Sequence, residues 1–240
     1  MKTIDAKGMD FTDLNELLRE SEGDTEILGC LGQRFIGAGM GNRKLAIRGV
    51  PGNALGAYLN GAEIEVFGNA QDAVGDTMNA GTILIHGSIG DTAGYAMRGG
   101  KIYVRGSAGY RAGIHMKEYK EHIPVIVIGG RTGSFLGEYQ AGGLIIVLGL
   151  HEDGKPIVSN FPCTGMHGGK LFLRSRCEDI AFPKQVTART ASAEDLKEIA
   201  PYLSEYCDAF NLNKDEILSA PFTVVTPDSA NPYRQMYVAN

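Results

Sequence analysis

The sequence predicts an all-β fold, a single-stranded parallel β-helix built from 19-residue repeats with short helices at both ends. Two columns of glycines recur at that period, whatever fold is assumed. They are Gly49, Gly68, Gly87 and Gly106, and Gly56, Gly75, Gly94 and Gly113. A repeat of this length holds short strands and tight turns, whereas a crossover connection alone needs about a dozen residues. Stacked coils are therefore expected in place of βαβ units.

A short strand precedes each glycine of the first column. In the segments 44–49, 63–68, 82–87 and 101–106, aliphatic residues occupy alternate positions. This alternation predicts that one set of side chains points into the solenoid. That set comprises Leu45, Ile64, Ile83 and Ile102, and Ile47, Val66, Ile85 and Val104. The pattern returns at 125–130, 144–149 and 170–175, so the longer spacings there indicate insertions at turns.

A column of unbranched side chains follows the second glycine column. Its members are Leu59, Met78, Met97 and Met116. Unbranched side chains fill irregular interior space well, so we expect this column to stack in the core. It is not expected to form a methionine-rich metal site.

Helices are expected at both ends of the chain. Thr12 is the expected N-cap of an N-terminal helix with one apolar face. Ser192 and Asp195 resemble a capping box, and the helix that follows is expected to be interrupted at Pro201. A second short helix is expected to start at Asn213.

The predicted organisation has three parts. An N-terminal helical cap spans 1–30, the β-helix spans 31–180, and a C-terminal helical segment with an irregular tail from residue 229 spans 181–240. An open β-helix exposes unpaired strand edges at its ends, so terminal helices are expected to act as lids.

One outward column changes character along the stack. It begins with Ala46 and Glu65, but its later members are apolar. These are Leu84, Tyr103, Val127, Ile146 and Phe172. An apolar stripe of this kind is not expected to face water. The C-terminal helices are the favoured cover, and the alternative is an interface with another subunit or a second copy of the chain.

Composition excludes several classes of protein. No run approaches the eighteen apolar residues of a membrane span, and the N-terminus lacks an apolar signal core, so a cytoplasmic location is expected. A net charge of −5 without a long basic tract argues against nucleic acid as a partner. The four cysteines show no CxxC spacing and are expected to be reduced.

Few residues suggest chemistry. The stretch Gly37-Ala-Gly39-Met-Gly41 lacks the spacing of a dinucleotide fingerprint and is expected to be a structural corner. Cys163 and His167 could form a metal or nucleophile pair, but only two ligands are present locally. Carboxylates on turns could act as an acid–base pair on a sugar, although solvated turn acids are commoner. They are Asp72, Asp76, Asp91, Glu118 and Glu138.

The repeat and three of its motifs resemble a known family. The motifs are Gln33-Arg-Phe-Ile-Gly-Ala-Gly-Met-Gly41, Gly99-Gly-Lys-Ile-Tyr-Val-Arg-Gly106 and Gly165-Met-His-Gly-Gly-Lys170. With the 19-residue repeat, they resemble the GXGXG domain at the C-terminus of the glutamate synthase large subunit. The opening segments Ile4-Asp-Ala-Lys-Gly8 and Leu14-Asn-Glu16 are most similar to the stand-alone, archaeal-type form. One of the subunits of formylmethanofuran dehydrogenase shares the repeat.

The resemblance implies a scaffold role in nitrogen metabolism. In that family the domain is a right-handed β-helix without catalytic residues, and it packs against glutamine amidotransferase and FMN-binding synthase chains. Those partners transfer the amide nitrogen of glutamine to 2-oxoglutarate for glutamate biosynthesis. FMN and the iron–sulfur cluster are expected in the partners, and neither cofactor nor metal in this chain, which should have no synthase activity alone.

Two alternatives remain open. The first is a scaffold subunit of a formylmethanofuran dehydrogenase-type molybdenum or tungsten enzyme. The second is a self-contained enzyme that uses Cys163 and His167 or a pair of turn carboxylates.

Overall fold

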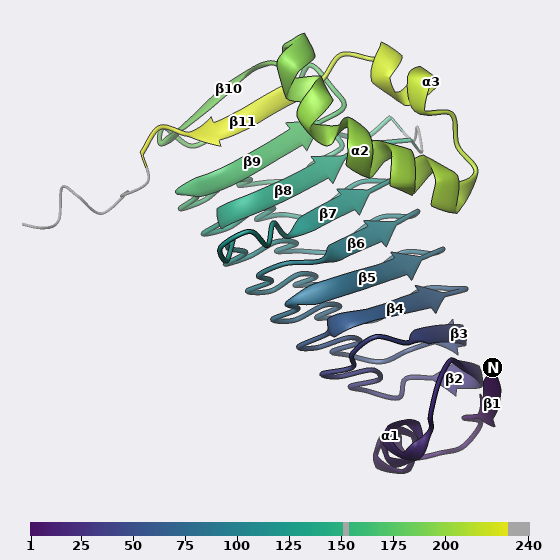
Figure 1. The fold of residues 1–240 in the computed structure, drawn as a ribbon. Coiled ribbons are helices and arrows are strands. Elements are labelled where there is room, and N and C mark those ends of the chain that lie inside the picture. Colours follow the sequence, from purple (N-terminus) through teal and green to yellow (C-terminus); the bar gives the residue numbers. More distant parts are fainter. Residues whose placement is uncertain (151–153, 230–240) are drawn as a thin grey trace, which may run out of the picture.

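The computed structural model describes residues 1–150 and 154–229, and they form a β-solenoid whose strands lie in one long sheet (Figure 1). The sheet has 11 strands in the order β1-β2-β3-β4-β5-β6-β7-β8-β9-β11-β10. The elements are β1 Lys2–Asp5, α1 Phe11–Glu20, β2 Thr25–Leu31, β3 Lys44–Val50, β4 Asn60–Val66, β5 Ala80–Ile85, β6 Lys101–Val104, β7 Val125–Ile128, β8 Ala141–Val147, β9 Gly168–Leu173, β10 Val186–Thr190, α2 Ala193–Phe210, α3 Lys214–Ser219 and β11 Thr223–Pro227.

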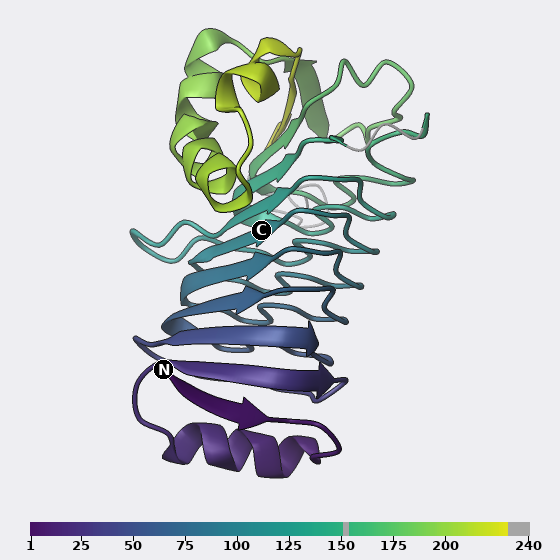
Figure 2. The same ribbon diagram turned by 90° about the vertical axis from the view of Figure 1, so that its right-hand side faces the viewer.

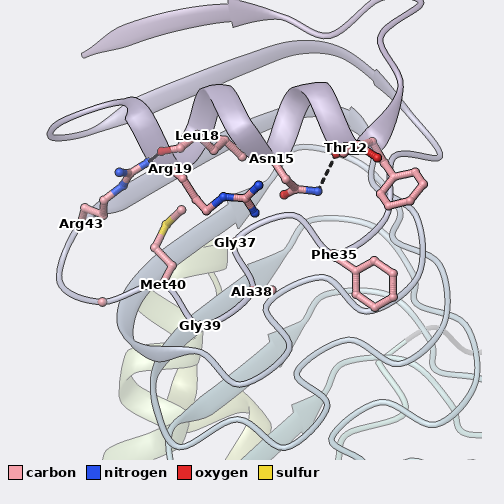
Figure 3. Close-up of a pocket in the computed structure, with 12 residues that line it drawn as sticks. Thr12, Asn15, Leu18, Arg19, Phe35, Gly37, Ala38, Gly39, Met40 and Arg43 are labelled. Carbon is pink, nitrogen blue, oxygen red and sulfur yellow. Dashed lines mark hydrogen bonds between the residues drawn. The ribbon is translucent and has the colours of Figure 1, made fainter.

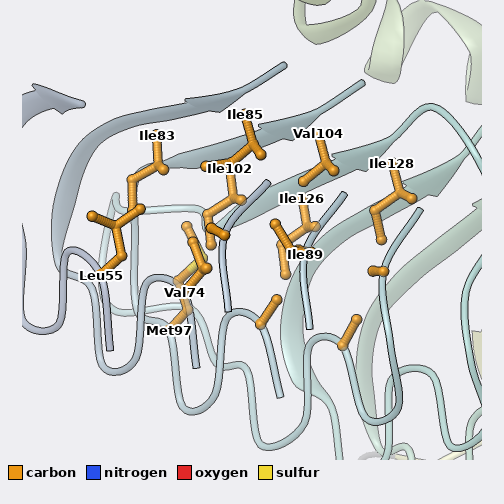
Figure 4. Close-up of a cluster of buried hydrophobic side chains, with 14 of the residues drawn as sticks. Leu55, Val74, Ile83, Ile85, Ile89, Met97, Ile102, Val104, Ile126 and Ile128 are labelled. Atoms are coloured by element: carbon orange, nitrogen blue, oxygen red, sulfur yellow. The ribbon is translucent and has the colours of Figure 1, made fainter. Parts of the chain in front are cut away.

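The strands stack in parallel and in register from β1 to β9. Ile83 lies between Ile64 and Ile102, and each longer spacing is absorbed outside the strands, so that Ile126 pairs with Ile102. Figure 4 shows Ile83, Ile102 and Ile126 in a row that points into the interior. The inward columns are at most 1% exposed, which confirms their predicted direction. Leu59, Met78, Met97 and Met116 are fully buried in the same core, also as predicted.

The two glycine columns have different physical causes. A Cβ on Gly68 would lie 2.6 Å from the carbonyl oxygen of Gly49, so the backbone of the preceding coil excludes a side chain. A Cβ on Gly75 would lie 2.5 Å from Cδ1 of Ile102, which projects from the second strand after it. Gly75 also has φ +68°, a conformation that costs other residues strain. Glycine is therefore required at Gly68 by the preceding backbone and at Gly75 by an inward isoleucine together with a left-handed φ.

The N-terminal end holds more than a helix. α1 is present, but its N-cap is Asp10, whose carboxylate accepts the N–H of Thr12 at 2.8 Å. The predicted cap Thr12 is wrong, because a carboxylate two residues earlier already serves the first turn. Leu14 and Leu18 of α1 are buried against the first coils. β1 pairs with β2 and extends the sheet beyond the predicted repeat.

The C-terminal end also differs from the prediction in one element. The capping box of Ser192 and Asp195 is present, and Asn213 caps α3 as expected. α2 continues through Pro201, so the predicted interruption is wrong. Proline removes one hydrogen bond of the helix, but buried residues such as Ile199 and Leu203 hold the turns on both sides against the sheet. No helix among the described residues is long and apolar enough to cross a membrane.

The last strands close the open end of the solenoid. β11 pairs antiparallel with both β9 and β10, so the edge of β9 is not left unpaired. Figure 2 shows α2 and α3 packed on one face of the sheet at the end far from α1. The domain boundaries at residues 30 and 180 stay a prediction.

Replacing Gly75 with alanine should destabilise the fold more than the same change at Gly39. Both glycines have φ near +67°, but a Cβ on Gly39 would meet no atom within 4 Å. We expect Gly75→Ala to lower the free energy of unfolding by about 2–4 kcal/mol, and Gly39→Ala by about 1–2 kcal/mol, because only the first adds overpacking to strain. Urea denaturation of both variants measures the difference. Equal losses would show that the approach of Ile102 does not require glycine.

The capping box should make stability depend on pH. The Arg189 guanidinium, 2.6 Å from Oδ2 of Asp195, holds the pKa of that carboxyl well below its usual range. Because the pKa of Asp195 is lower in the folded chain than in the unfolded chain, the ionised carboxylate stabilises the fold at pH values above the ordinary Asp pKa of about 4. This stabilisation is lost progressively as the pH falls from that value toward the folded-state pKa. We expect Asp195→Asn to cost about 1–3 kcal/mol at pH 7 and progressively less toward about pH 3.

The control for Asp195 is Glu194→Gln on the same turn. The Glu194 side chain is 84% exposed in its ion pair with Lys197, so its replacement should change stability by less than about 0.5 kcal/mol. Thermal melts at both pH values give the comparison. A loss at Asp195 that is the same at both pH values would contradict the assignment.

Candidate interaction surface

The apolar outer stripe is covered within the chain. Tyr103, Val127, Ile146 and Phe172 are at most 1% exposed and pack with α2 residues in a second core. The α2 residues that contribute are Ile199, Leu203, Tyr206, Cys207 and Phe210. Leu84, the fifth member of the stripe, is half-buried at the margin of this core. While α2 is in place, a partner chain has no access to the four buried residues.

Polar contacts fix where α2 lies. The Tyr206 hydroxyl donates to the carbonyl oxygen of Val104 at 3.2 Å, from the centre of the helix–sheet contact. Near the margin, Glu205 accepts from Tyr103 at 2.9 Å and from Lys101 at 2.6 Å. Burial and the nearby Glu205 carboxylate raise the pKa of Tyr103, so its hydroxyl remains a donor at neutral pH. These contacts hold the helix in one position on the sheet.

The outer face of β3 to β5 lies beyond α2 and carries charged and aromatic residues. Arg48 lies 4.3 Å from the Phe67 ring centroid, and Phe67 stacks on His86 at 4.9 Å between ring centroids. His86 meets Phe210 of α2 edge-on at 5.3 Å and contacts Glu65 at 2.8 Å. This series of stacked groups joins the open face to the helix that covers the rest of the sheet.

A hollow of about 330 Å³ lies beside this series. It is lined by Met1, by strands β3 to β6 and by the end of α2, and its charged side chains are Lys44, Glu63, Glu65 and Glu205. Lys44 and Glu63 pair across neighbouring strands at 2.7 Å. We define the open face as the outer surface of β3 to β5 together with this hollow.

The Gly37-Ala-Gly39-Met-Gly41 segment borders a different hollow, of about 550 Å³, between α1 and the first coil (Figure 3). Arg43 closes one side of it, and its guanidinium donates to the carbonyl oxygens of Leu18 and Ser21 at the end of α1. A Cβ on Gly37 would lie 2.8 Å from Cδ1 of Ile64, so this glycine serves packing. The segment is a corner of the first coil, and α1 is held beside it by hydrogen bonds from Arg43 and from the Asn15 side chain, which donates to the carbonyl oxygen of Arg34.

Cys163 and His167 are not arranged as a reactive pair. Cys163 is fully buried, and burial raises the pKa of its thiol to about 12. His167 has Nδ1 3.0 Å from the carbonyl oxygen of Gly165, and no hydrogen bond joins its ring to Cys163 within the described chain. A nucleophilic cysteine needs thiolate character, which burial removes here.

Cys163 instead occupies a position of the second glycine column. It follows Gly113 and Gly137 in that column after the two insertions, and its φ is +60°. In the coils of Gly75, Gly94 and Gly113 an isoleucine of a later strand fills the space that a Cβ would need. After β9 no further parallel strand follows, because β11 pairs in the opposite direction. A cysteine side chain therefore fits where glycine is otherwise needed.

The turn carboxylates each bind a structural partner. Oδ1 of Asp72 accepts the N–H of Asp91 at 2.9 Å, and Oδ1 of Asp91 accepts the N–H of Tyr110 at 2.8 Å. Glu118 accepts the N–H of Gly143 at 2.8 Å. The other two are also engaged, Asp76 with the hydroxyl of Thr77 and Glu138 with Arg111. These contacts link coils and turns and do not form a paired acid–base site.

In the described part of the chain, no group of three or more His, Cys, Asp or Glu side chains is placed so that it could hold a metal ion. The sequence alone does not identify the open face, because the outward positions Arg48, Phe67 and His86 have the mixed character of residues that face water. Their equivalent positions in successive coils are the signal that could have identified the series.

Comparison with known proteins shows which family the chain belongs to. The model of the GXGXG motif family matches residues 21–228. The chain belongs to the GXGXG family. "Uncharacterized protein MJ1350" of Methanocaldococcus jannaschii is 43% identical over 248 residues, covering 98% of this chain and 95% of that protein. The family assignment confirms the resemblance that the sequence motifs indicated.

A solved structure has the same fold. A chain of the formyltransferase/hydrolase complex from Methylorubrum extorquens, in complex with methylofuran, is 18% identical. Its TM-score is 0.63, over 92% of this chain and 89% of that chain. At this identity the likeness shows the GXGXG solenoid fold alone.

The Cys163 thiol should resist alkylation in the folded chain. With a pKa of about 12, its thiolate fraction at pH 8 is about 10⁻⁴. We expect iodoacetamide at that pH to leave Cys163 unmodified in the native chain and to modify it in urea, as measured by peptide mass spectrometry. Native labelling as fast as that in urea would contradict the buried thiol and revive a reactive role.

Proposed function

We propose that this chain is a non-catalytic scaffold subunit of a glutamate synthase-type complex. Partner chains would carry out the transfer of the glutamine amide to 2-oxoglutarate, and FMN and an iron–sulfur cluster would lie in those partners. Family membership and the opening segments near Ile4 and Leu14 support this choice. The complex would be cytoplasmic.

The open face is the observation that carries the proposal. α2 covers the apolar part of the outer sheet, whereas the face of β3 to β5 presents Arg48, Phe67 and charged pairs. Aromatic and arginine side chains dominate the energetics of protein interfaces, and charged rims fix orientation. A partner of standard interface size would cover about 800 Å² of this side. We assign the open face to an amidotransferase or FMN-binding synthase chain.

The fold likeness favours a second candidate. The similar structure belongs to a formyltransferase/hydrolase complex, so a GXGXG solenoid occurs in an assembly with other chains. In that case this chain would be a scaffold in a formylmethanofuran-type enzyme that handles one-carbon units. The nature of the bound chains and of their cofactors separates the two candidates.

Capture of partners by a surface variant tests the proposal. The full chain is tagged in its native cells, and the co-purified polypeptides are identified together with the absorbance of the eluate. Phe67 is 38% exposed in the open face, and Tyr95 is 41% exposed on a turn, which makes it a matched control. We expect an amidotransferase and a flavin- and iron–sulfur-containing chain with the wild type and Tyr95→Glu, and at least about tenfold less with Phe67→Glu.

Other outcomes are equally informative. Recovery of formyltransferase-type chains would replace the first candidate with the second. Recovery that is unchanged in Phe67→Glu would exclude the open face as the docking surface. Absence of either kind of partner from the wild-type chain would overturn the scaffold proposal.

A further inference from the structure

A third hollow, of about 400 Å³, lies where β4, β5 and β6 begin. Tyr58, Asn60, Asn79 and Arg98 line it from successive coils, and Tyr119 and His122 line it from the turn before β7. Gly39 and Ala80 complete the lining. The lining lies where these strands begin and shares no residue with the hollow of the open face or with the α2 contact. The hollow is therefore a separate feature of the solenoid.

Three polar side chains that line this hollow have no hydrogen-bond partner within the described chain. Asn53 and Asn69, which lie on turns of the same coils, accept backbone N–H groups of the next coil at 3.3 and 2.8 Å. By contrast, the side chains of Asn60, Asn79 and Arg98 make no hydrogen bond or ion pair with described residues. Hydrogen-bonding groups that the fold does not use therefore line this hollow.

An insertion builds one wall of the hollow. The spacing from β6 to β7 is 24 residues, where the repeat has 19. The extra residues form a turn in which Tyr119 and His122 exchange two backbone hydrogen bonds, at 3.1 and 3.0 Å. The turn lies against the coil, because a Cβ on Gly99 would be 2.9 Å from Cβ of His122. The departure from the repeat thus places His122 beside Arg98.

The charge of the lining differs from that of the whole chain. The chain has a net charge of −5, yet no Asp or Glu lines this hollow. Glu118, just before the turn, accepts the N–H of Gly143, and Glu121, within the turn, is exposed and does not line the hollow. Arg98 supplies a guanidinium, and the asparagine amides supply further donors. This donor set matches the oxygens of a phosphate or carboxylate group.

The tyrosines add an apolar component. Tyr58 and Tyr119 line the hollow and are 58% and 55% exposed. Small-molecule sites combine such surfaces with a few convergent polar groups. We propose that this hollow binds a small organic anion, whose phosphate or carboxylate group contacts Arg98 and the asparagines while its organic part packs on the tyrosines. This inference does not rest on the proposed scaffold function.

Calorimetric titration of the full chain tests the site. The probes are AMP, which carries a phosphate, and citrate, which carries carboxylates, with adenosine as the uncharged counterpart of AMP. We expect saturable binding of AMP or citrate at low ionic strength, and the probe that binds identifies the anionic group. Arg98→Gln should weaken that binding by about tenfold or more, because a charge-assisted hydrogen bond is lost.

Two further variants make the result decisive. Arg176→Gln is the matched control, since Arg176 is also exposed, makes no hydrogen bond or ion pair with described residues through its side chain, and lines another hollow. It should bind like the wild type, whereas Asn79→Ala should bind more weakly. Absence of saturable binding of both AMP and citrate up to about 10 mM would overturn the proposal. Unchanged affinity in Arg98→Gln, or binding of adenosine equal to that of AMP, would overturn it as well.

Discussion

The close approach of successive coils is the constraint on which the rest of the structure depends. Parallel strands stack about 4.8 Å apart, and at Gly68 the preceding backbone occupies the place of a side chain. The same closeness brings Ile102 over Gly75 and fills the interior with aligned aliphatic rows. Coils can differ in length only where the chain leaves this stack. Both long spacings are accordingly accommodated in turns, while the strand register is kept.

The same stacking creates two ends that must be closed and one face that must be covered. At the first end, β1 and α1 extend and cap the solenoid. At the other, β11 reverses direction beside β9, which ends the repeat. The outer face is apolar only in its later coils, and α2 covers that part. The change from Glu65 to Val127 and Ile146 along one column therefore matches the part of the sheet that α2 covers.

The repetitive features could be predicted from the sequence because many equivalent residues report the same environment. The inward rows and the methionine column are examples. Features set by one residue were less predictable. Asp10 and Thr12 are both good caps, and only the backbone decides between them. Pro201 lies in a helix whose packing outweighs one lost hydrogen bond. The position of Cys163 in the second glycine column could not be read from the sequence, because two insertions change the 19-residue spacing before it.

The candidate sites could be predicted less well, because their residue types do not reveal whether the fold already uses them. Asp72 and Asp91 resembled catalytic carboxylates in sequence, but regular coils place a backbone N–H within reach of each. Arg98 resembles any exposed arginine until the following turn is seen to leave the repeat. In a solenoid the strands are committed to stacking, so groups free for recognition collect on turns and outer faces. An insertion that interrupts the 19-residue period therefore marks a place where polar side chains are not needed for stacking and are available to bind a ligand.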